Sequence, residues 1–408
     1  MHHLPSQTDH HPESEAAKHF GFQKKAKPHP GVKLKARTKS GDKMALSPVG
    51  MNKWDLDTPA LLVDLDKMEK NIGRMASICK KSGINWRPHT KGNKTPAIAH
   101  KLLDAGAIGI TCAKLGEAEV MAAAGIKDIL VANQVVGKPK MDRLVNLQRH
   151  ADVMVSIDNP VHVEMISEAA TEVGVSVRVL VEIDIGMNRC GVSPGKPALA
   201  LAQQAEAAAG VEFAGIMGYE GHAMDLPPET KASACAKAIS HLADARELIA
   251  VSGLRCGIVS AGGTGSLEHT PQCPGLTEIQ AGGGIFMDTF YPSAMDVKGL
   301  DQALTILTTI VSHPAPDRAY MDAGRKTTFG AFSLPEVKDN PGLKVTALSA
   351  EHGYLEITNG NNSVGVGDKI ELISGYSDMT VFLHNHLYGI RKDRVEAVWE
   401  ILGRGKLQ

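Results

Sequence analysis

The stretch DVMVSIDNPVHVEMISEAATEVGVSVRVLVEID, residues 152–184, shows the pattern that decides the fold. Its two ends, 152–158 and 178–184, are short apolar runs rich in Val and Ile, and a helix-sized segment separates them. Continuous apolar strands that alternate with helices are typical of a parallel sheet covered by helices on both faces. The sequence therefore predicts the α/β class.

The same alternation extends from residue 58 to residue 303 and contains eight predicted strands. They are 85–89, 109–114, 128–133, 152–158, 178–184, 213–219, 256–262 and 278–283. Eight strand–helix units predict a TIM-type (β/α)8 barrel. A doubly wound sheet is the alternative, because periodicity alone cannot show that a sheet closes.

After Ala303 the pattern changes to short alternating runs with little helix between them. The runs are 305–313, 318–324, 342–350, 353–358, 368–374 and 379–384. This pattern predicts an antiparallel β domain over residues 304–408. We expect residues 51–57 to join this domain, and the stretch DLDTPALLVDL (55–65) to lend it a strand.

Length and composition restrict the function. A chain of 408 residues is long enough for a barrel and a smaller domain, and its formal charge of −1 gives no reason to expect nucleic-acid or membrane partners. Residues 1–50 are rich in His, Lys, Pro and Ser and are predicted to be a disordered tail. The spread of six cysteines without a CxxC motif is typical of reduced thiols in a cytoplasmic enzyme. They are Cys79, Cys112, Cys190, Cys235, Cys256 and Cys273.

A lysine follows the first predicted barrel strand in WRPHTKGNK, residues 86–94. Barrel enzymes place their sites at the C-terminal ends of the strands, so Lys91 and the nearby His89 are candidate site residues. A lysine in a low-dielectric cleft can condense with an aldehyde to form a Schiff base. An exposed lysine at a strand exit is the alternative. The competing lysines are Lys94, Lys114 and Lys326.

Two glycine-rich turns follow the seventh and eighth predicted strands: SAGGTGS (260–266) and QAGGG (280–284). Glycines let backbone N–H groups turn toward an anion, and hydroxyl groups add contacts. In barrels a phosphate often binds after these two strands, although a flexible turn has the same composition. The candidate cofactor-binding residues here are Ser260, Gly262, Gly263, Thr264, Gly265 and Gly283.

The exits of the fifth and sixth strands carry further polar side chains. In EIDIGMNRCG (182–191), Arg189 can hold a cofactor or a substrate carboxylate through two hydrogen bonds, or simply end a salt-bridged strand. In GYEGHAM (218–224), Tyr219 and His222 can orient a cofactor ring or transfer a proton. A lone histidine is more often structural. In the C-terminal region, His352, Asp378, His384 and His386 are candidate metal ligands, with an ordinary polar strand as the simpler interpretation.

Together these motifs resemble a known family. Their order is RPH-x-K, EID-x-G-x-NRCGV, G-Y-x-G-H, VS-x-GGTG, EIQAG with a later FMD, DAG-x-K, EHG and a final GRGKL. The chain is similar, from about Asp55 to Gln408, to the fold-type III pyridoxal-phosphate enzymes of the D-threonine aldolase and D-serine dehydratase group, which includes the 3-hydroxy-D-aspartate aldolases. The resemblance implies an alanine-racemase-like barrel, a β domain and a homodimer.

The resemblance also implies roles for single residues. Lys91 would form the Schiff base with pyridoxal 5'-phosphate, 262–265 would hold the phosphate, and Arg189 and Tyr219 would lie near the cofactor. The family binds a divalent cation through His-x-Cys or His-x-Asp, and this chain has Tyr376-Ser377-Asp378 there. An oxygen-only pair favours Mg or Mn over Zn, and His352 could add a nitrogen.

Two other positions depart from the family pattern. The family's Lys-x-His-Lys is Lys91-Gly92-Asn93-Lys94 here, and its Ser-Tyr pair after the eighth strand is Gly283-Gly284. The predicted function is a lyase that cleaves D-configured β-hydroxy amino acids to glycine and an aldehyde, with His222 as the base. The alternatives are a D-serine or 3-hydroxyaspartate dehydratase, an amino-acid racemase, and a non-catalytic pyridoxal-phosphate-binding protein.

Overall fold

Eight parallel strands form one sheet in the order β2-β9-β8-β7-β6-β5-β4-β3. They are β2 (Asn85–Trp86), β3 (Ile110–Cys112), β4 (Asp128–Gln134), β5 (Asp152–Ile157), β6 (Val177–Glu182), β7 (Val211–Met217), β8 (Ile258–Ala261) and β9 (Glu278–Ile279). His89, just beyond β2, forms an isolated parallel bridge with Thr111 of β3. This bridge closes the sheet, so the predicted barrel is confirmed and the doubly wound alternative is wrong.

The computed structural model describes residues 47–358 and 364–408, and Pro48–Gln408 forms one unit. The predicted tail at 1–50 lies outside the described residues, apart from 47–50. Within the described part, no helix combines the length and the apolar character that crossing a bilayer requires.

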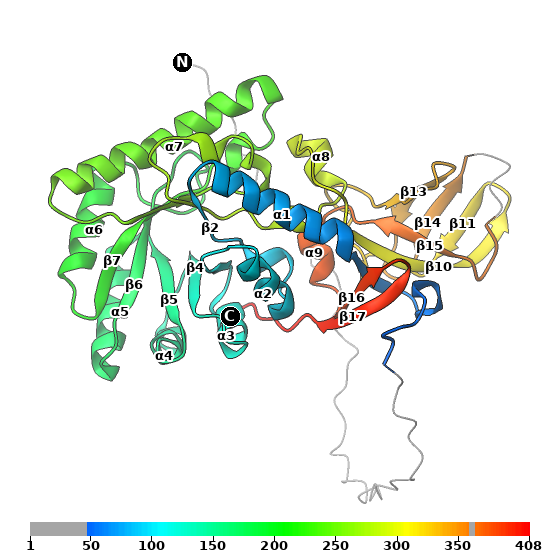
Figure 1. Ribbon diagram of the computed structural model, residues 1–408, viewed down its shortest axis with the longest axis horizontal. Helices are drawn as coiled ribbons and strands as arrows, with labels where there is room; N and C mark the ends of the chain where they lie inside the picture. Colours follow the sequence, from blue (N-terminus) through cyan, green and yellow to red (C-terminus); the bar gives the residue numbers. More distant parts are fainter. Residues whose placement is uncertain (1–46, 359–363) are drawn as a thin grey trace, which may run out of the picture. The chain divides into compact units, whose positions relative to one another are not determined.

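Helices alternate with the barrel strands, as Figure 1 shows for α4 to α7. Local signals set several of their ends: the Asp64 side chain accepts from the N–H of Lys67 at the start of α1, and Gly174, with φ of 70°, ends α5. The helices are α1 (Leu65–Lys81), α2 (Pro96–Asp104), α3 (Leu115–Ala123), α4 (Lys138–Leu147), α5 (Pro160–Val173), α6 (Lys196–Ala207) and α7 (Pro228–Val251).

The barrel interior is filled by side chains, so it is a core rather than a pore. Leu130, Met154, Leu180 and Met217 come from β4, β5, β6 and β7, are nearly or fully buried, and pack together inside. Full burial of each such side chain contributes about 1.5–3 kcal/mol. The site can therefore form only beyond this packed layer, at one end of the barrel.

A second sheet contains nine strands. They are β1 (Ala60–Asp64), β10 (Leu304–Ala315), β11 (Arg318–Met321), β12 (Glu336–Val337), β13 (Leu343–Leu348), β14 (Gly353–Ile357), β15 (Lys369–Ile373), β16 (His386–Arg391) and β17 (Arg394–Glu400). The strand expected within 55–65 is confirmed as β1, which pairs with β10. The sheet is mixed rather than purely antiparallel, because β1 pairs with β16 in parallel. These two strands come from opposite ends of the chain, so no hairpin fixes their relative direction.

The predicted strand at 379–384 is wrong. This segment contains most of a short helix, α9 (Ser377–Val381), in which residues 377, 378, 380 and 381 are buried. That spacing fits one face of a helix. The sequence missed the hairpin of β16 and β17, whose turn residues Lys392 and Asp393 have φ of 49° and 60°. Neither is a glycine or an asparagine, so the usual turn signal is absent.

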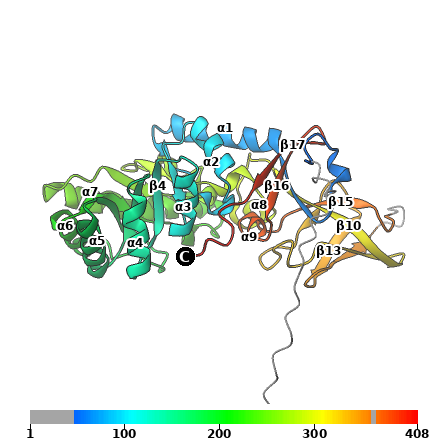
Figure 2. The ribbon, with the colours of Figure 1, turned by 90° about the horizontal axis from the view of Figure 1, so that it is seen from below.

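Figures 1 and 2 place α9 at the junction between the barrel and the second sheet. There α9 contacts η2 (Thr90–Gly92), the turn that carries Lys91. The short helix α8 (Phe290–Met295), which follows the second glycine turn, also lies in this region (Figure 2). The fold thus brings a segment from residues 376–381 against the turn after β2.

Candidate active site

A cavity of about 320 Å³ lies at the C-terminal ends of the barrel strands. Most of the residues predicted for cofactor binding line it, together with one of the predicted metal ligands. These residues are Lys91, His89, Arg189, Tyr219, Gly262, Gly263, Thr264, Gly265, Gly283 and Tyr376.

Lys91 is the only lysine among the described residues that line this cavity. Its side chain is 49% exposed, and its Nζ lies 3.7 Å from Oδ2 of Asp378. The competing lysines differ: Lys94 pairs with the buried Glu117, and Lys326 pairs with Glu351 in the second sheet. The structure therefore leaves Lys91 as the amine that a ligand in the cavity can reach.

His89 orients the turn that carries Lys91. Its Nδ1 accepts a hydrogen bond from the backbone N–H of Lys91 at 3.3 Å. Desolvation of the ring and the charges of Lys91 and Lys94 hold the pKa of His89 well below its usual value. The imidazole is therefore neutral at physiological pH, as an accepting nitrogen requires.

Two short turns, η4 (Thr264–Ser266) and η6 (Gly283–Ile285), begin at the cavity wall. The N–H of Gly284 donates to Oγ1 of Thr264 at 2.9 Å, which ties the turns together. Thr264 and Gly265 open η4, so their N–H groups precede its first internal hydrogen bond, from Ser266 to Gly263. Such backbone donors suit a phosphate group.

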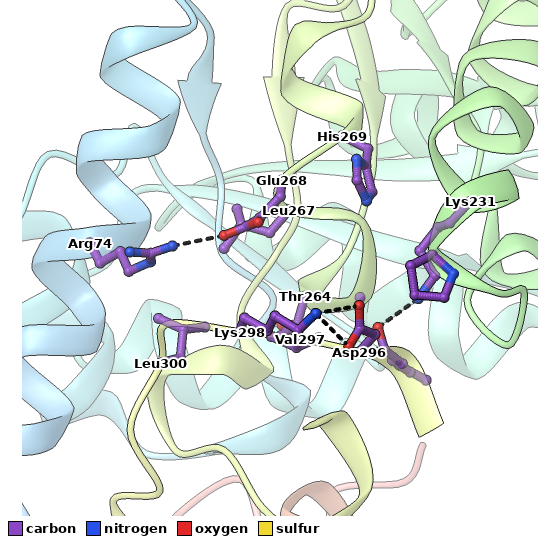
Figure 3. Close-up of a pocket in the computed structure, with 13 residues that line it drawn as sticks. Arg74, Lys231, Thr264, Leu267, Glu268, His269, Asp296, Val297, Lys298 and Leu300 are labelled. Atoms are coloured by element: carbon purple, nitrogen blue, oxygen red, sulfur yellow. Dashed lines mark hydrogen bonds and ion pairs between the residues drawn. The ribbon is translucent and has the colours of Figure 1, made fainter. Parts of the chain in front are cut away.

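A smaller cavity of about 130 Å³ shares Thr264 and Gly265 with the larger one. Its cations already have partners (Figure 3): Arg74 with Glu268 at 2.7 Å and Lys298 with Asp296 at 3.0 Å. Lys231 donates to the carbonyl oxygen of Met295 at 2.6 Å. Because these cations are already paired, an anion is better bound by the backbone N–H groups of the glycine turns at the larger cavity.

Arg189 lies between an acid and an aromatic ring. Its guanidinium lies 3.8 Å from Oε1 of the buried Glu182 and 5.8 Å from the ring centroid of Tyr219. Gln134 donates to Glu182 at 2.6 Å, yet burial raises the pKa of this carboxyl. Burial also raises the pKa of Tyr219 far above its usual value, so its phenol stays protonated. Arg189, held between Glu182 and Tyr219, can therefore help to orient a flat ring.

Four predicted site residues do not line the cavity: Asp378, which lies behind its wall, and three others. Ser260 is fully buried beneath it and accepts from Gln280 at 2.9 Å. His222 is exposed, because the turn η3 (Gly221–Ala223) directs its ring against Gly186, outside the cavity. His352 lies in the turn between β13 and β14, where its N–H donates to Ser349.

Of the predicted metal ligands, Tyr376 and Asp378 are in direct contact. Tyr376 donates its phenolic proton to Oδ2 of Asp378 at 3.3 Å, and Lys91 supplies a positive charge beside the same oxygen. His384 bonds to the carbonyl oxygen of Thr327 instead. Among residues 47–358 and 364–408, no group of three or more His, Cys, Asp or Glu side chains is arranged to hold a metal ion. Burial raises the pKa of Tyr376 far above its usual value, and one carboxylate beside a phenol that stays protonated does not fit a divalent cation.

Several residues of the cavity wall are not among those predicted from the sequence. Asn133 and Gln134 end β4 and contribute polar groups; the rule that strand ends carry the site could have found them. Tyr291 and Met295 come from α8. No local signal marks these two, because only the packing of α8 brings them to the cavity.

A (β/α)8 barrel with a lysine after its first strand and paired glycine turns after its last two has the features of a pyridoxal-phosphate-binding barrel. The model of the alanine racemase N-terminal domain matches residues 63–290, and that of a putative serine dehydratase domain matches residues 303–390. The chain therefore belongs to the alanine racemase N-terminal domain family and combines that domain with a serine-dehydratase-type domain.

The chain is similar over nearly its whole length to known lyases. It is 38% identical to the D-threonine aldolase of Arthrobacter sp. over 92% of this chain and 97% of that protein. The crystal structure of D-threonine aldolase from Filomicrobium marinum has a TM-score of 0.85 at 34% identity, covering 89% of this chain and 100% of that chain.

A dehydratase is also similar. D-threo-3-hydroxyaspartate dehydratase from Delftia sp. HT23 has a TM-score of 0.79 at 28% identity, covering 86% of this chain and 98% of that chain. A mutant of D-threo-3-hydroxyaspartate dehydratase is described in a metal-free form.

Proposed function

We propose that this protein is a pyridoxal-phosphate-dependent lyase that cleaves D-configured β-hydroxy amino acids to glycine and an aldehyde. The observation that carries the proposal is the amine of Lys91, the one lysine that the described residues bring to a cavity walled by two glycine turns. The whole-length similarity to D-threonine aldolases supports the same class of substrate.

The residues present fit the cofactor. Lys91 would hold it through a covalent bond to its aldehyde, because the amine is half exposed in the cavity. The N–H groups of Thr264 and Gly265, with those of the second turn, would bind the phosphate. A Cβ on Gly262 would meet Ile279 at 2.6 Å, so a side chain there would disturb this cradle. Arg189 and Tyr219 would hold the ring, with His89 keeping the Lys91 turn in place.

When bound, pyridoxal phosphate withdraws the electron pair that remains on Cα when a bond to Cα breaks. The chain must then select which bond breaks and move one proton. Breaking Cα–Cβ requires a group that takes the proton of the β-hydroxyl. The sequence predicts His222 in this role, but its ring lies outside the cavity. The proton acceptor must therefore come from the cavity wall or the carboxylate behind it.

A dehydratase is the second candidate. In that reaction the Cα proton leaves and the β-hydroxyl departs, which gives a keto acid and ammonia instead of glycine. The structural similarity to D-threo-3-hydroxyaspartate dehydratase favours keeping this candidate. Lys91 would take the Cα proton in that case.

Product analysis separates the two candidates. The purified protein, reconstituted with pyridoxal phosphate, is incubated with D-threonine, D-serine and 3-hydroxy-D-aspartate. We expect glycine from D-threonine; a keto acid with ammonia would instead identify a dehydratase.

Lys91→Ala should lose both activity and the visible absorbance of the bound cofactor. The matched control is Lys326→Ala, which removes a surface pair with Glu351 and should change neither. Full absorbance in Lys91→Ala would refute the proposal.

We also propose that the enzyme works in the cytosol as a homodimer. All six cysteines are free, in keeping with a reducing compartment. Phe332 is 61% exposed within an aromatic cluster that includes Tyr376 of the cavity wall, where a second subunit could cover it. Light scattering at several concentrations tests the dimer, and a mass of one chain throughout would refute it.

A further inference from the structure

The segment 376–378 brings a phenol and a carboxylate to the amine of Lys91. Tyr376 lines the cavity, and its hydroxyl donates to Oδ2 of Asp378 at 3.3 Å. The Nζ of Lys91 lies 3.7 Å from the same oxygen. The phenol and the amine therefore meet at one carboxylate oxygen, at the place where a ligand tethered to Lys91 would react.

The carboxylate of Asp378 is buried against the turn that carries Lys91. Asp378 is 8% exposed, its Oδ1 is buried without a hydrogen-bond partner in the described structure, and this oxygen faces Gly92 of the Lys91 turn. A Cβ on Gly92 would overlap this carboxylate. Only Oδ2 is therefore directed toward Tyr376 and Lys91, and it can exchange a proton with the phenol.

The ring of Tyr376 is fixed as well. It packs against Phe290, Phe332 and Phe329, with ring centroids 5.5, 5.4 and 6.1 Å away. Aromatic contacts of this kind restrict the orientation of a ring. The hydroxyl of Tyr376 is thus presented at a defined place in the cavity wall rather than on a mobile side chain.

We propose that Tyr376 and Asp378 form a proton relay that replaces a divalent cation in the cleavage of the substrate, so that this enzyme needs no metal. The inference rests on the proposed function. The Cα–Cβ bond breaks, and its electron pair stays on Cα. The β-hydroxyl proton passes to Oη of Tyr376 while the phenolic proton passes to Oδ2 of Asp378. The β-carbon becomes the carbonyl carbon of the aldehyde.

The relay balances without a further reactant. Cα takes up one proton when glycine forms, and Asp378 gives up the proton that it received. No oxidant or reductant takes part. Tyr376 is the catalytic residue in this step because it contacts the β-oxygen, and Asp378 acts through Tyr376.

The first test compares metal binding and metal dependence. Wild-type holoenzyme is titrated with MnCl₂ and followed by calorimetry, and glycine formation is measured with and without excess EDTA. We expect no stoichiometric Mn²⁺ binding and an unchanged rate in EDTA. Binding of one Mn²⁺ per chain, or loss of activity in EDTA, overturns the proposal. If the wild type forms no glycine from any D-β-hydroxy amino acid, the proposed function fails before the relay is at issue.

The second test removes the hydroxyl alone. Tyr376→Phe keeps the aromatic packing and should lower kcat by about 10²–10⁴-fold, the usual contribution of general acid–base catalysis, while KM changes little. The matched control is Tyr354→Phe, which removes a partly exposed phenol of β14 that packs on Tyr320. Asp378→Asn should also lower kcat rather than raise KM. Wild-type kcat in Tyr376→Phe overturns the relay.

A third variant tests the role of position 376 in excluding the metal. Tyr376→His removes the phenol and adds a nitrogen ligand beside Asp378. We expect this variant to bind Mn²⁺ and to gain activity when MnCl₂ is added, whereas Tyr376→Phe gains none. If Tyr376→His binds Mn²⁺ no better than the wild type, residue 376 is not what replaces the cation, and the proposal is overturned.

Discussion

Replacing Gly282 by alanine should damage both the barrel and the site. Gly282 follows β9 and has φ of −143°, which any residue can adopt, so its backbone conformation does not require glycine. The lack of space around Gly282 does require glycine. A Cβ would lie 2.7 Å from the backbone nitrogen of His89 and 2.9 Å from its carbonyl carbon, and closer still to the carbonyl oxygen. Backbone atoms cannot rotate away as a side chain can.

The expected loss in the free energy of unfolding follows from the backbone contacts of His89. Its N–H donates to the carbonyl oxygen of Gln280 at 3.0 Å, and it bridges Thr111 where the barrel closes. Overpacking of a dense region costs about 1–3 kcal/mol, and one weakened backbone hydrogen bond adds about 1 kcal/mol. We therefore expect Gly282→Ala to lower the free energy of unfolding by about 2–4 kcal/mol. A shift of Lys91 by about 1 Å would also lower kcat on the order of 10²-fold.

Urea unfolding followed by circular dichroism measures the first effect, and glycine formation measures the second. The matched control is Gly73→Ala in α1, where a Cβ meets no atom within 4 Å. This control should be stabilised by about 0.5–1 kcal/mol, because alanine favours a helix interior over glycine. If Gly282→Ala has the stability and activity of the wild type, the turn after β9 is not packed against the turn after β2 as described.

Three further changes have defined outcomes. Glu278→Ala removes one of the two carboxylates that pair with the buried Arg87 and leaves Asp128 at 2.6 Å, so it should cost about 1–3 kcal/mol in urea unfolding; an unchanged midpoint would contradict this. Thr264→Val leaves the N–H of Gly284 without its acceptor, costs about 1–3 kcal/mol and should weaken cofactor binding, as fluorescence titration would show. Burial raises the pKa of Asp288 to about 6, so the folded state retains a proton that the unfolded state releases near pH 4. Wild-type stability should therefore fall by roughly 2–3 kcal/mol as pH rises through 6, whereas Asp288→Asn should lack this loss; parallel pH profiles of unfolding would refute it.

Patterns along the chain predicted the barrel well because each strand is a continuous apolar run. The run at 152–158 appears as β5 (Asp152–Ile157), and the run at 178–184 appears as β6 (Val177–Glu182). A strand that is buried on both faces must be apolar at nearly every position, whatever the arrangement of the helices that cover it. The prediction of a strand at 379–384 is wrong because residues 379–381 are the last turn of the short buried helix α9, whose apolar side chains resemble part of a strand.

Candidate site residues were predictable where the backbone at a strand end fixes them. Lys91 and the glycine turns follow barrel strands directly and line the cavity. His222 also follows a strand, but the turn η3 directs its ring outward. Tyr291 carries no signal in its own neighbourhood, since the packing of α8 alone brings it to the wall.

By itself, the sequence determined the alternation of strands and helices, the lysine after the first barrel strand and the glycine turns after the last two. These features depend on hydrophobic periodicity and on local backbone freedom, which neighbouring residues set. Only the tertiary structure decided that the barrel closes at His89 and that Tyr376 and Asp378 meet Lys91. The contact between Lys91 and Asp378 joins residues nearly 300 positions apart. Like the closure of the barrel, it depends on how whole elements pack rather than on any local pattern.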